Sequence, residues 1–292
     1  VIEEMRILQP SSMVQVSKKN PDRLLKRALK IIKTGFGQPS IFNADAIVKE
    51  HLRQGKTLAD AREGGASGCV ESGIFGKESY ILTGYFNLVK VMEITLNRGK
   101  DPRTGEQIGP VTRDPRRMES FDDFYGEFQR QLKFFIDCKI GGNDRIEALY
   151  SALLPAPFLS LLIDDCVQKG LDYHSGGARY NTNYIQGVGI GTGTDVLSAL
   201  RTLVFEEGQI PIDRLLTALR RDFEGEEVLR QRLLNGVPKY GNDNPSADDL
   251  AVRLFDSFFG MVDGRPTFRG GKYRINLLPT TVHVYFGSVL GA

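Results

Sequence analysis

The sequence predicts a mixed α/β fold in which helices dominate and strands are few. Three observations lead to this prediction. Several stretches repeat apolar residues at helical spacing. Long glycine-rich segments, such as 64–76 and 187–195, separate these stretches. The best strand candidate is the tail, where Val282, Val284 and Phe286 alternate with His283 and Tyr285.

The amino-terminal part predicts two helices and a helical turn. Pro21 to Lys33 is amphipathic, with Asn20 as a candidate N-cap and proline at the first helical position. A second helix is expected over 44–54, where Gly55 stops it. The run "KTLADAR" predicts one short turn, which the next glycines end. The glycines of 64–73 argue against a regular helix or a central strand there.

Most of the remaining apolar periodicity is helical. Leu82 and Phe86 belong to a helix expected over 80–97. Thr194 or Asp195 is expected near the start of another helix. Further helices are predicted over 121–140, 158–169 (as a buried helix), 212–221 and 247–261.

Composition excludes several classes of protein. Hydrophobic content is 41%, charged content is 25% and the net charge is +2, so nothing predicts a basic nucleic-acid surface. The longest mostly apolar run, 153–163, holds two prolines and is too short for a bilayer span. The three cysteines make no disulfide framework and no metal-ligand spacing. This cysteine usage favours a reduced, cytoplasmic setting.

Cys69 and Glu71 form the most informative local pattern. In extended backbone, side chains two residues apart point to the same side, so both can face one cavity. Desolvation in an apolar cavity raises the pKa of a carboxylate, which suits acid–base work. A neighbouring carboxylate disfavours a thiolate, so the pair fits hydrogen-atom abstraction better than nucleophilic attack. The alternative is a small buried cysteine in a glycine-rich loop.

Other candidate residues favour structural roles. Cys138 and Cys166 are expected to be packing residues on helices. His51 and His174 show no metal spacing, and His283 is expected as a hydrogen-bonded histidine on the tail strand. "GVGIGTGTD" lacks the ending of a phosphate loop, so close backbone packing is favoured over nucleotide binding. The run "GGARYNTN" predicts either a polar pocket or a solvated loop, formed by Arg179, Tyr180 and Asn183.

Several segments together resemble one enzyme family. "ASGCVESGIFGKESYILTGYF" and its continuation resemble the cysteine-loop region of glycyl radical enzymes, in the Gly-Cys-Val-Glu branch of dehydratases and related lyases. "GFGQPSIFN" precedes it; "PAPFLSLLIDDC", "GGARYNTNYIQGVGIGTGTD", "PKYGND" and "PTTVHVYFGSVLGA" follow in the family's order. The continuation "SGIFGKESYILTGYFN" resembles the hydroxyproline dehydratases, and the adjacent cysteine pair of pyruvate formate-lyase is absent.

The resemblance implies a fold that this chain covers only in part. The family fold is a ten-stranded barrel of two antiparallel five-stranded half-barrels, surrounded by helices. Residues 1–292 would be the middle portion of a single catalytic domain, with the cysteine loop near 64–76. The family's radical glycine, in an Arg-Val-x-Gly-Tyr-like motif, has no counterpart here, so the C-terminal radical-glycine domain is expected to be absent. This portion alone is expected to be inactive.

The resemblance also implies residue roles and partners. Cys69 would be the thiyl radical that takes a hydrogen atom, Glu71 the acid–base residue, and Tyr85 a pocket residue. The reaction would remove water from a small hydroxylated substrate such as 4-hydroxyproline, without a bound cofactor or metal. An activating enzyme with S-adenosylmethionine and an iron–sulfur cluster would install the glycyl radical, and a homodimer is expected. The alternatives are another lyase of the branch, such as a glycerol or propanediol dehydratase or a chain named formate acetyltransferase, and a non-catalytic remnant.

Overall fold

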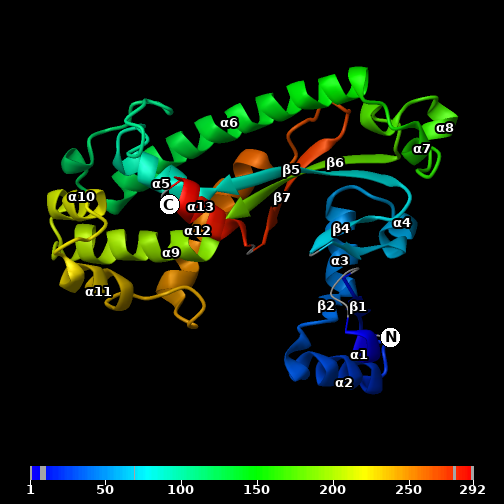
Figure 1. Cartoon of the computed structure of the whole chain (residues 1–292), viewed down its shortest axis with the longest axis horizontal. Helices are drawn as coiled ribbons and strands as arrows, with labels where there is room; N and C mark the ends of the chain where they lie inside the picture. Colours follow the sequence, from blue (N-terminus) through cyan, green and yellow to red (C-terminus); the bar gives the residue numbers. More distant parts are fainter. Residues whose placement is uncertain (1, 7–10, 69, 279–280, 291–292) are drawn as a thin grey trace. The chain divides into compact units, whose positions relative to one another are not determined.

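The computed structural model of the chain describes residues 2–6, 11–68, 70–278 and 281–290 (Figure 1). Its contacts group the chain into two compact units. The first unit comprises residues 1–81, 148–182 and 269–271. The second comprises residues 82–147, 183–268 and 272–292. Both helices and strands are present, so the mixed α/β class is confirmed.

The first unit is built from short elements. They are α1 (Ile2–Met5), β1 (Met13–Val16), α2 (Asp22–Ile31) with a π-helical extension (Ile32–Phe36), β2 (Ser40–Asn43), α3 (Ala44–Arg53), α4 (Leu58–Glu63), β3 (Gly64–Ser67), β4 (Glu71–Ile74), α7 (Pro157–Ser160) and α8 (Cys166–Lys169). β1 and β2 pair in parallel, and β3 and β4 form an antiparallel hairpin. Side chains cap two helices, because Asn43 accepts from Ala46 N–H and Thr57 accepts from Asp60 N–H.

The second unit holds the largest described apolar core. Its elements are α5 (Leu88–Leu96), α9 (Ile190–Ala199) with a π-helical extension (Leu200–Glu206), α10 (Ile212–Arg220), α11 (Glu227–Asn235), α12 (Pro245–Val262), β7 (Lys272–Leu277) and α13 (Val282–Leu290). Three more elements contribute residues to both units: β5 (Glu78–Asn87), α6 (Phe121–Leu153) and β6 (Tyr180–Val188). The strand order in the sheet is β5-β6-β7.

Helical periodicity explains why this core forms. Phe124, Phe128, Leu132 and Ile136 recur every four residues along α6, and all are fully buried. α12 packs against α9 in the same core. No helix within the described residues is long and apolar enough to cross a membrane.

Several predicted helices are confirmed, with corrected ends. α3, α10 and α12 match their predicted ranges closely, and α6 is longer than its predicted range of 121–140. α2 begins at Asp22, with Pro21 rather than Asn20 at the cap position. α9 begins at Ile190, earlier than Thr194 or Asp195, because the left-handed Gly189 (φ 92°) ends the preceding strand.

Three predictions were wrong. Residues 80–87 belong to strand β5, and only 88–96 are helical. The prediction failed because this apolar run is rich in β-branched and aromatic residues, and its spacing fits either the strand period or the helix period. The buried helix over 158–169 is replaced by α7 and α8, with the left-handed Asp165 before α8 and Leu161 68% exposed. The tail is helix α13, not a strand, and its Val284 is 76% exposed.

Candidate active site

The segment that carries the predicted catalytic pair is a β-hairpin rather than an irregular loop. β3 and β4 pair from Gly64↔Ile74 to Ser67↔Glu71, so the two strands are connected between Ser67 and Glu71. Gly68 has a φ of 61°, and a Cβ on it would collide with the Glu71 carboxylate. A larger residue at Gly68 would therefore be strained by its backbone conformation, and it would displace the Glu71 carboxylate. Cys69 lies outside the described residues.

Glu71 is held close to its own loop. Its side chain is half-buried, and Oε2 accepts a hydrogen bond from Val70 N–H at 3.0 Å. A carboxylate that receives a backbone N–H is fixed in direction, which suits a group that exchanges protons with a small molecule. That Glu71 faces the same cavity as Cys69 stays a prediction.

A buried charge cluster lies at the base of this hairpin. Glu78, the first residue of β5, forms an ion pair with Lys56 at 2.6 Å, and their side chains are only 1% and 2% exposed. Glu78 also accepts hydrogen bonds from Ile74 N–H, at 2.9 Å, and from the Thr182 hydroxyl. A buried pair is tolerated only when further hydrogen bonds satisfy it, as these do.

His51 completes this cluster. Its Nδ1 lies 3.2 Å from Lys56 Nζ, which can only donate, so Nδ1 is assigned as the acceptor. Nε2 therefore carries the proton, and it has no hydrogen-bond partner among the described residues. Burial, with Lys56 close by, lowers the pKa of His51 from the usual 6.5 to about 4. The local sequence does not indicate this role for His51, or any role for Glu78 and Lys56.

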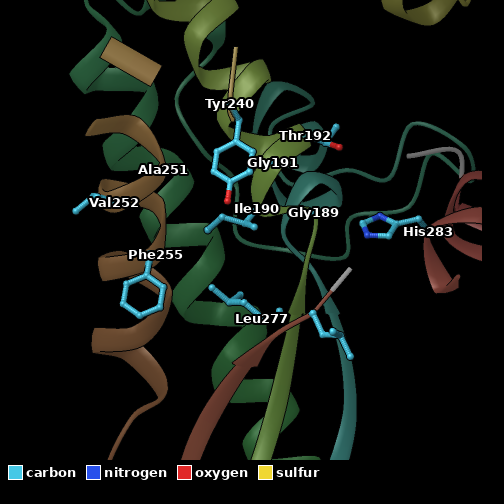
Figure 2. Close-up of a pocket in the computed structure, with 12 residues that line it drawn as sticks. Gly189, Ile190, Gly191, Thr192, Tyr240, Ala251, Val252, Phe255, Leu277 and His283 are labelled. Atoms are coloured by element: carbon cyan, nitrogen blue, oxygen red, sulfur yellow. The ribbon is translucent and has the colours of Figure 1, made fainter. Parts of the chain in front are cut away.

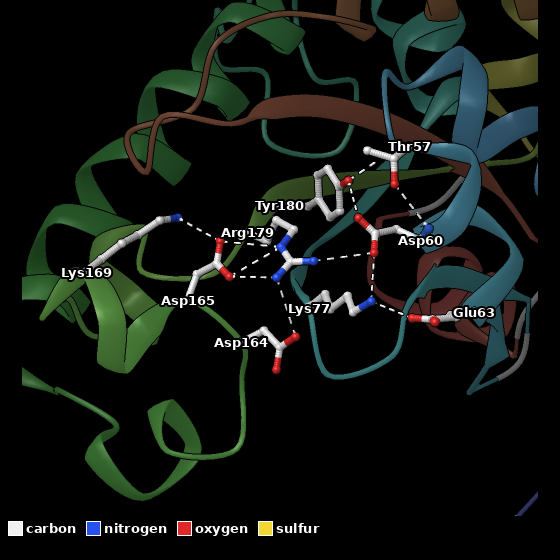
Figure 3. Close-up of polar contacts among 9 residues, drawn as sticks. All are labelled: Thr57, Asp60, Glu63, Lys77, Asp164, Asp165, Lys169, Arg179 and Tyr180. Atoms are coloured by element: carbon white, nitrogen blue, oxygen red, sulfur yellow. Dashed lines mark hydrogen bonds and ion pairs between the residues drawn. The ribbon is translucent and has the colours of Figure 1, made fainter.

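A second polar network in the same unit links α4, the β4–β5 turn and the start of β6 (Figure 3). Asp60 accepts from Lys77 and from the Tyr180 hydroxyl, both at 2.7 Å, and these bonds hold the pKa of Asp60 well below its usual range. Arg179 pairs with Asp165 at 2.9 Å and approaches Asp60. Arg179 and Tyr180 thus belong to one hydrogen-bonded network, in which Tyr180 is half-buried and Arg179 is exposed.

Tyr85, the third predicted site residue, lies on β5 among residues of the second unit. Its side chain is 44% exposed. The neighbouring Thr83 hydroxyl donates to the Tyr184 carbonyl at 2.8 Å, which joins β5 to β6. The role of Tyr85 as a pocket residue stays a prediction.

A cavity of about 540 Å³ lies in the second unit, beside the glycine-rich turn after β6 (Figure 2). Its walls are mainly apolar side chains from α9, α12 and β7, and its lining also includes Tyr240, Thr192 and His283. The prediction for His283 was wrong, since this residue is exposed on helix α13 and does not lie on a strand.

The glycines of the run "GVGIGTGTD" are explained by close packing, as predicted. A Cβ on Gly187 would lie 2.8 Å from Phe258 and 2.7 Å from Leu277. A Cβ on Gly193 would lie 3.0 Å from Leu254.

The prediction that Cys166 packs inside is confirmed, whereas Cys138 is exposed on α6, so its predicted packing role was wrong. No group of side chains within the described residues could hold a metal ion.

Comparison with known proteins gives consistent matches along the chain. The family model "pyruvate formate lyase-like" matches residues 1–287. Trans-4-hydroxy-L-proline dehydratase of Clostridioides difficile is 51% identical over 292 residues. That alignment covers 100% of this chain and 37% of the relative, so the chain spans little more than a third of its length.

Solved structures of two dehydratases share the fold. Hydroxyproline dehydratase of Clostridioides difficile, crystallised with trans-4-hydroxy-L-proline bound, matches with a TM-score of 0.97 at 50% identity, over 100% of this chain and 37% of that chain. The glycerol-bound B12-independent glycerol dehydratase of Clostridium butyricum matches with a TM-score of 0.92 at 35% identity, over 97% of this chain and 36% of that chain.

Proposed function

Because this chain belongs to the pyruvate formate lyase-like family, we propose that it is the cysteine-loop portion of a glycyl radical dehydratase that acts on 4-hydroxyproline. One observation carries the proposal: the chain is 51% identical, over its whole length, to trans-4-hydroxy-L-proline dehydratase. Its fold also matches a dehydratase solved with that substrate, at a TM-score of 0.97.

The proposed reaction divides the chemistry between two residues. The Cys69 thiyl radical takes a hydrogen atom from a substrate carbon, which breaks a C–H bond and forms an S–H bond. Glu71 then gives a proton to the substrate hydroxyl, which leaves as water, and recovers a proton from the substrate. The product radical takes the hydrogen atom back from Cys69 and so restores the thiyl radical. The net change is the loss of one water molecule.

The geometry of the hairpin supports the proton-transfer role proposed for Glu71. Glu71 is the first residue of β4 and pairs with Ser67, the last residue of β3. The N–H of Val70 holds one carboxylate oxygen of Glu71 in place beside the loop, which fixes the direction of the group proposed to exchange a proton. We propose Tyr85 as a pocket residue of the same reaction.

The remaining parts of the proposal concern the whole protein. β5, β6 and β7 would form part of the ten-stranded barrel, whose closed interior would keep radicals away from water and oxygen. An activating enzyme that uses S-adenosylmethionine and an iron–sulfur cluster would install the glycyl radical. No metal or organic cofactor would be bound for the elimination itself. We further propose a cytoplasmic homodimer.

The test of Cys69 uses the full-length protein after anaerobic activation. Cys69→Ala should abolish turnover and leave the glycyl radical signal in electron paramagnetic resonance at its normal intensity, because the stored radical does not depend on the thiol. Cys166→Ala is the matched control, since this buried thiol lies on α8 and has no proposed role. Turnover that survives in Cys69→Ala would refute the proposed role.

The substrate is tested by a parallel screen. Trans-4-hydroxyproline, glycerol, 1,2-propanediol and choline are each offered to the activated full-length protein, and the loss of each is measured. The proposal expects the highest kcat/KM for hydroxyproline. Faster conversion of glycerol would favour the alternative function, glycerol dehydration, which the second structural match supports.

A further inference from the structure

The hairpin that carries Cys69 and Glu71 needs an anchor. It has two strands of four residues each, β3 and β4, and three of these residues are glycines. An isolated two-stranded hairpin is marginally stable in water, and glycine weakens strands further. A slip of one residue would turn the Glu71 side chain to the opposite face. Something outside the hairpin must therefore set its register.

The buried carboxylate of Glu78 meets this need. It accepts from Ile74 N–H, which lies in the last pair of the hairpin ladder, Gly64↔Ile74. The same carboxylate accepts from Lys56, which precedes α4, and from Thr182 on β6. One side chain thus fastens β4 to two other segments of the first unit.

The glycines of the hairpin fit this anchor. A Cβ on Gly73 would lie 3.2 Å from Glu78 Oε2, which is tighter than ordinary contact. A Cβ on Gly64 would lie 2.9 Å from His51 Nε2. The strands therefore lie directly against the charge cluster, with no side chain between the backbone and Glu78 at this point.

From these contacts we propose that Glu78 is a positioning residue for the cysteine loop. It accepts a hydrogen bond from Ile74 N–H and so sets the register of the strand that presents Glu71, while the ion pair with Lys56 holds the Glu78 carboxylate in place. This inference rests on the proposed function for its effect on turnover. Glu78 touches no reacting atom in this account, so its loss should lower kcat and leave KM nearly unchanged.

Two double variants separate the hydrogen bond from the charge. Removing one partner of a buried ion pair leaves the other charge uncompensated, so both partners are changed together. In Lys56→Met/Glu78→Gln the charges are gone, but the glutamine oxygen still accepts from Ile74 N–H. In Lys56→Met/Glu78→Leu the acceptor for Ile74 N–H is lost, and so is the partner of the Thr182 hydroxyl. The two variants therefore differ in these two hydrogen bonds, and only the bond to Ile74 lies in the hairpin.

The control is an ion pair of similar burial elsewhere in the chain. Arg274 and Asp263 pair at 2.8 Å with side chains 7% and 11% exposed, and both belong to the second unit. Arg274→Met/Asp263→Leu removes this pair in the same way. It measures how much the loss of a buried ion pair in the other unit affects overall stability.

The readouts are made on the activated full-length protein. Hydrogen exchange of the peptide that contains Ile74 should be about 10- to 100-fold faster in the leucine variant, as expected for a lost buried hydrogen bond. The glutamine variant and the control should retain protection there. We expect kcat to fall at least tenfold in the leucine variant only, with KM within about threefold and the glycyl radical signal unchanged.

Two results would overturn the inference. Native exchange at Ile74 in the leucine variant would mean that Glu78 does not hold the hairpin. Equal losses of kcat in the glutamine and leucine variants would mean that the bond to Ile74 is not what matters. If the unmodified protein converts no hydroxyproline, the proposed function fails, and the exchange comparison still decides the role of Glu78.

Discussion

Protonation of His51 should destabilise the fold in mild acid. The ring is fully buried against Lys56, and Glu78 and Glu50 are the acidic groups that act on it. A proton on Nδ1 would remove the acceptor for Lys56 and place a second positive charge beside it. His51 therefore stays neutral in the folded protein at pH values where the unfolded chain already binds the proton. The free energy of unfolding should accordingly fall as the pH falls.

The size of this effect follows from the lowered pKa. The pKa of His51 is about 4 in the folded protein against the usual 6.5. Between these values the unfolded chain binds a proton that the folded chain does not, so stability falls as the pH falls. At about 1.36 kcal/mol per pKa unit, the loss from pH 7.5 down to pH 4 approaches about 3 kcal/mol.

The assay compares unfolding of the unmodified full-length protein with His51→Asn. The asparagine oxygen can replace Nδ1 as the acceptor for Lys56, but it does not titrate. We expect the midpoint of thermal unfolding to fall more steeply between pH 6.5 and 4.5 in the unmodified protein than in the variant. Identical pH slopes in the two proteins would refute the reasoning, whatever their stabilities at pH 7.5.

Two glycine substitutions test the packing in opposite directions. In Gly64→Ala the new methyl group would lie 2.8 Å from the Gly73 carbonyl, so we expect a loss of about 1–3 kcal/mol in thermal or denaturant unfolding; unchanged stability would show that the hairpin base has room. In Gly126→Ala the methyl group meets nothing within 4 Å on an exposed face of α6, so the variant should gain about 1 kcal/mol. A loss there would argue against a continuous helix at that position.

The helices were the most predictable part of the fold. α3 has its capping Asn43 beside its first turn, and α12 has an apolar stripe that faces the core, so local sequence carries enough information for both. β5 was not predictable in this way, because its apolar run fits either period. What makes it a strand is pairing with β6, about 100 residues further along the chain.

The same limit applies to the candidate site. Cys69 and Glu71 are only two residues apart in sequence, so both their spacing and the family resemblance point to them. Lys56 and Glu78 are 22 residues apart, and charged residues are ordinarily exposed, so nothing local indicates that they meet in the interior. The motif thus identifies the candidate reacting groups, whereas the groups that support the hairpin emerge only from tertiary structure.

Hydrogen isotope exchange tests most directly the claim that the thiol and the carboxylate have separate tasks. Abstraction moves a substrate hydrogen atom onto the Cys69 sulfur, and where that S–H exchanges with D2O before the atom returns, the recovered hydroxyproline carries deuterium. Activated Glu71→Gln should still label the substrate while its dehydration falls by about 100-fold or more, and Cys69→Ala should do neither. Dehydration at the unmodified rate in Glu71→Gln, or labelling by Cys69→Ala, would contradict the account.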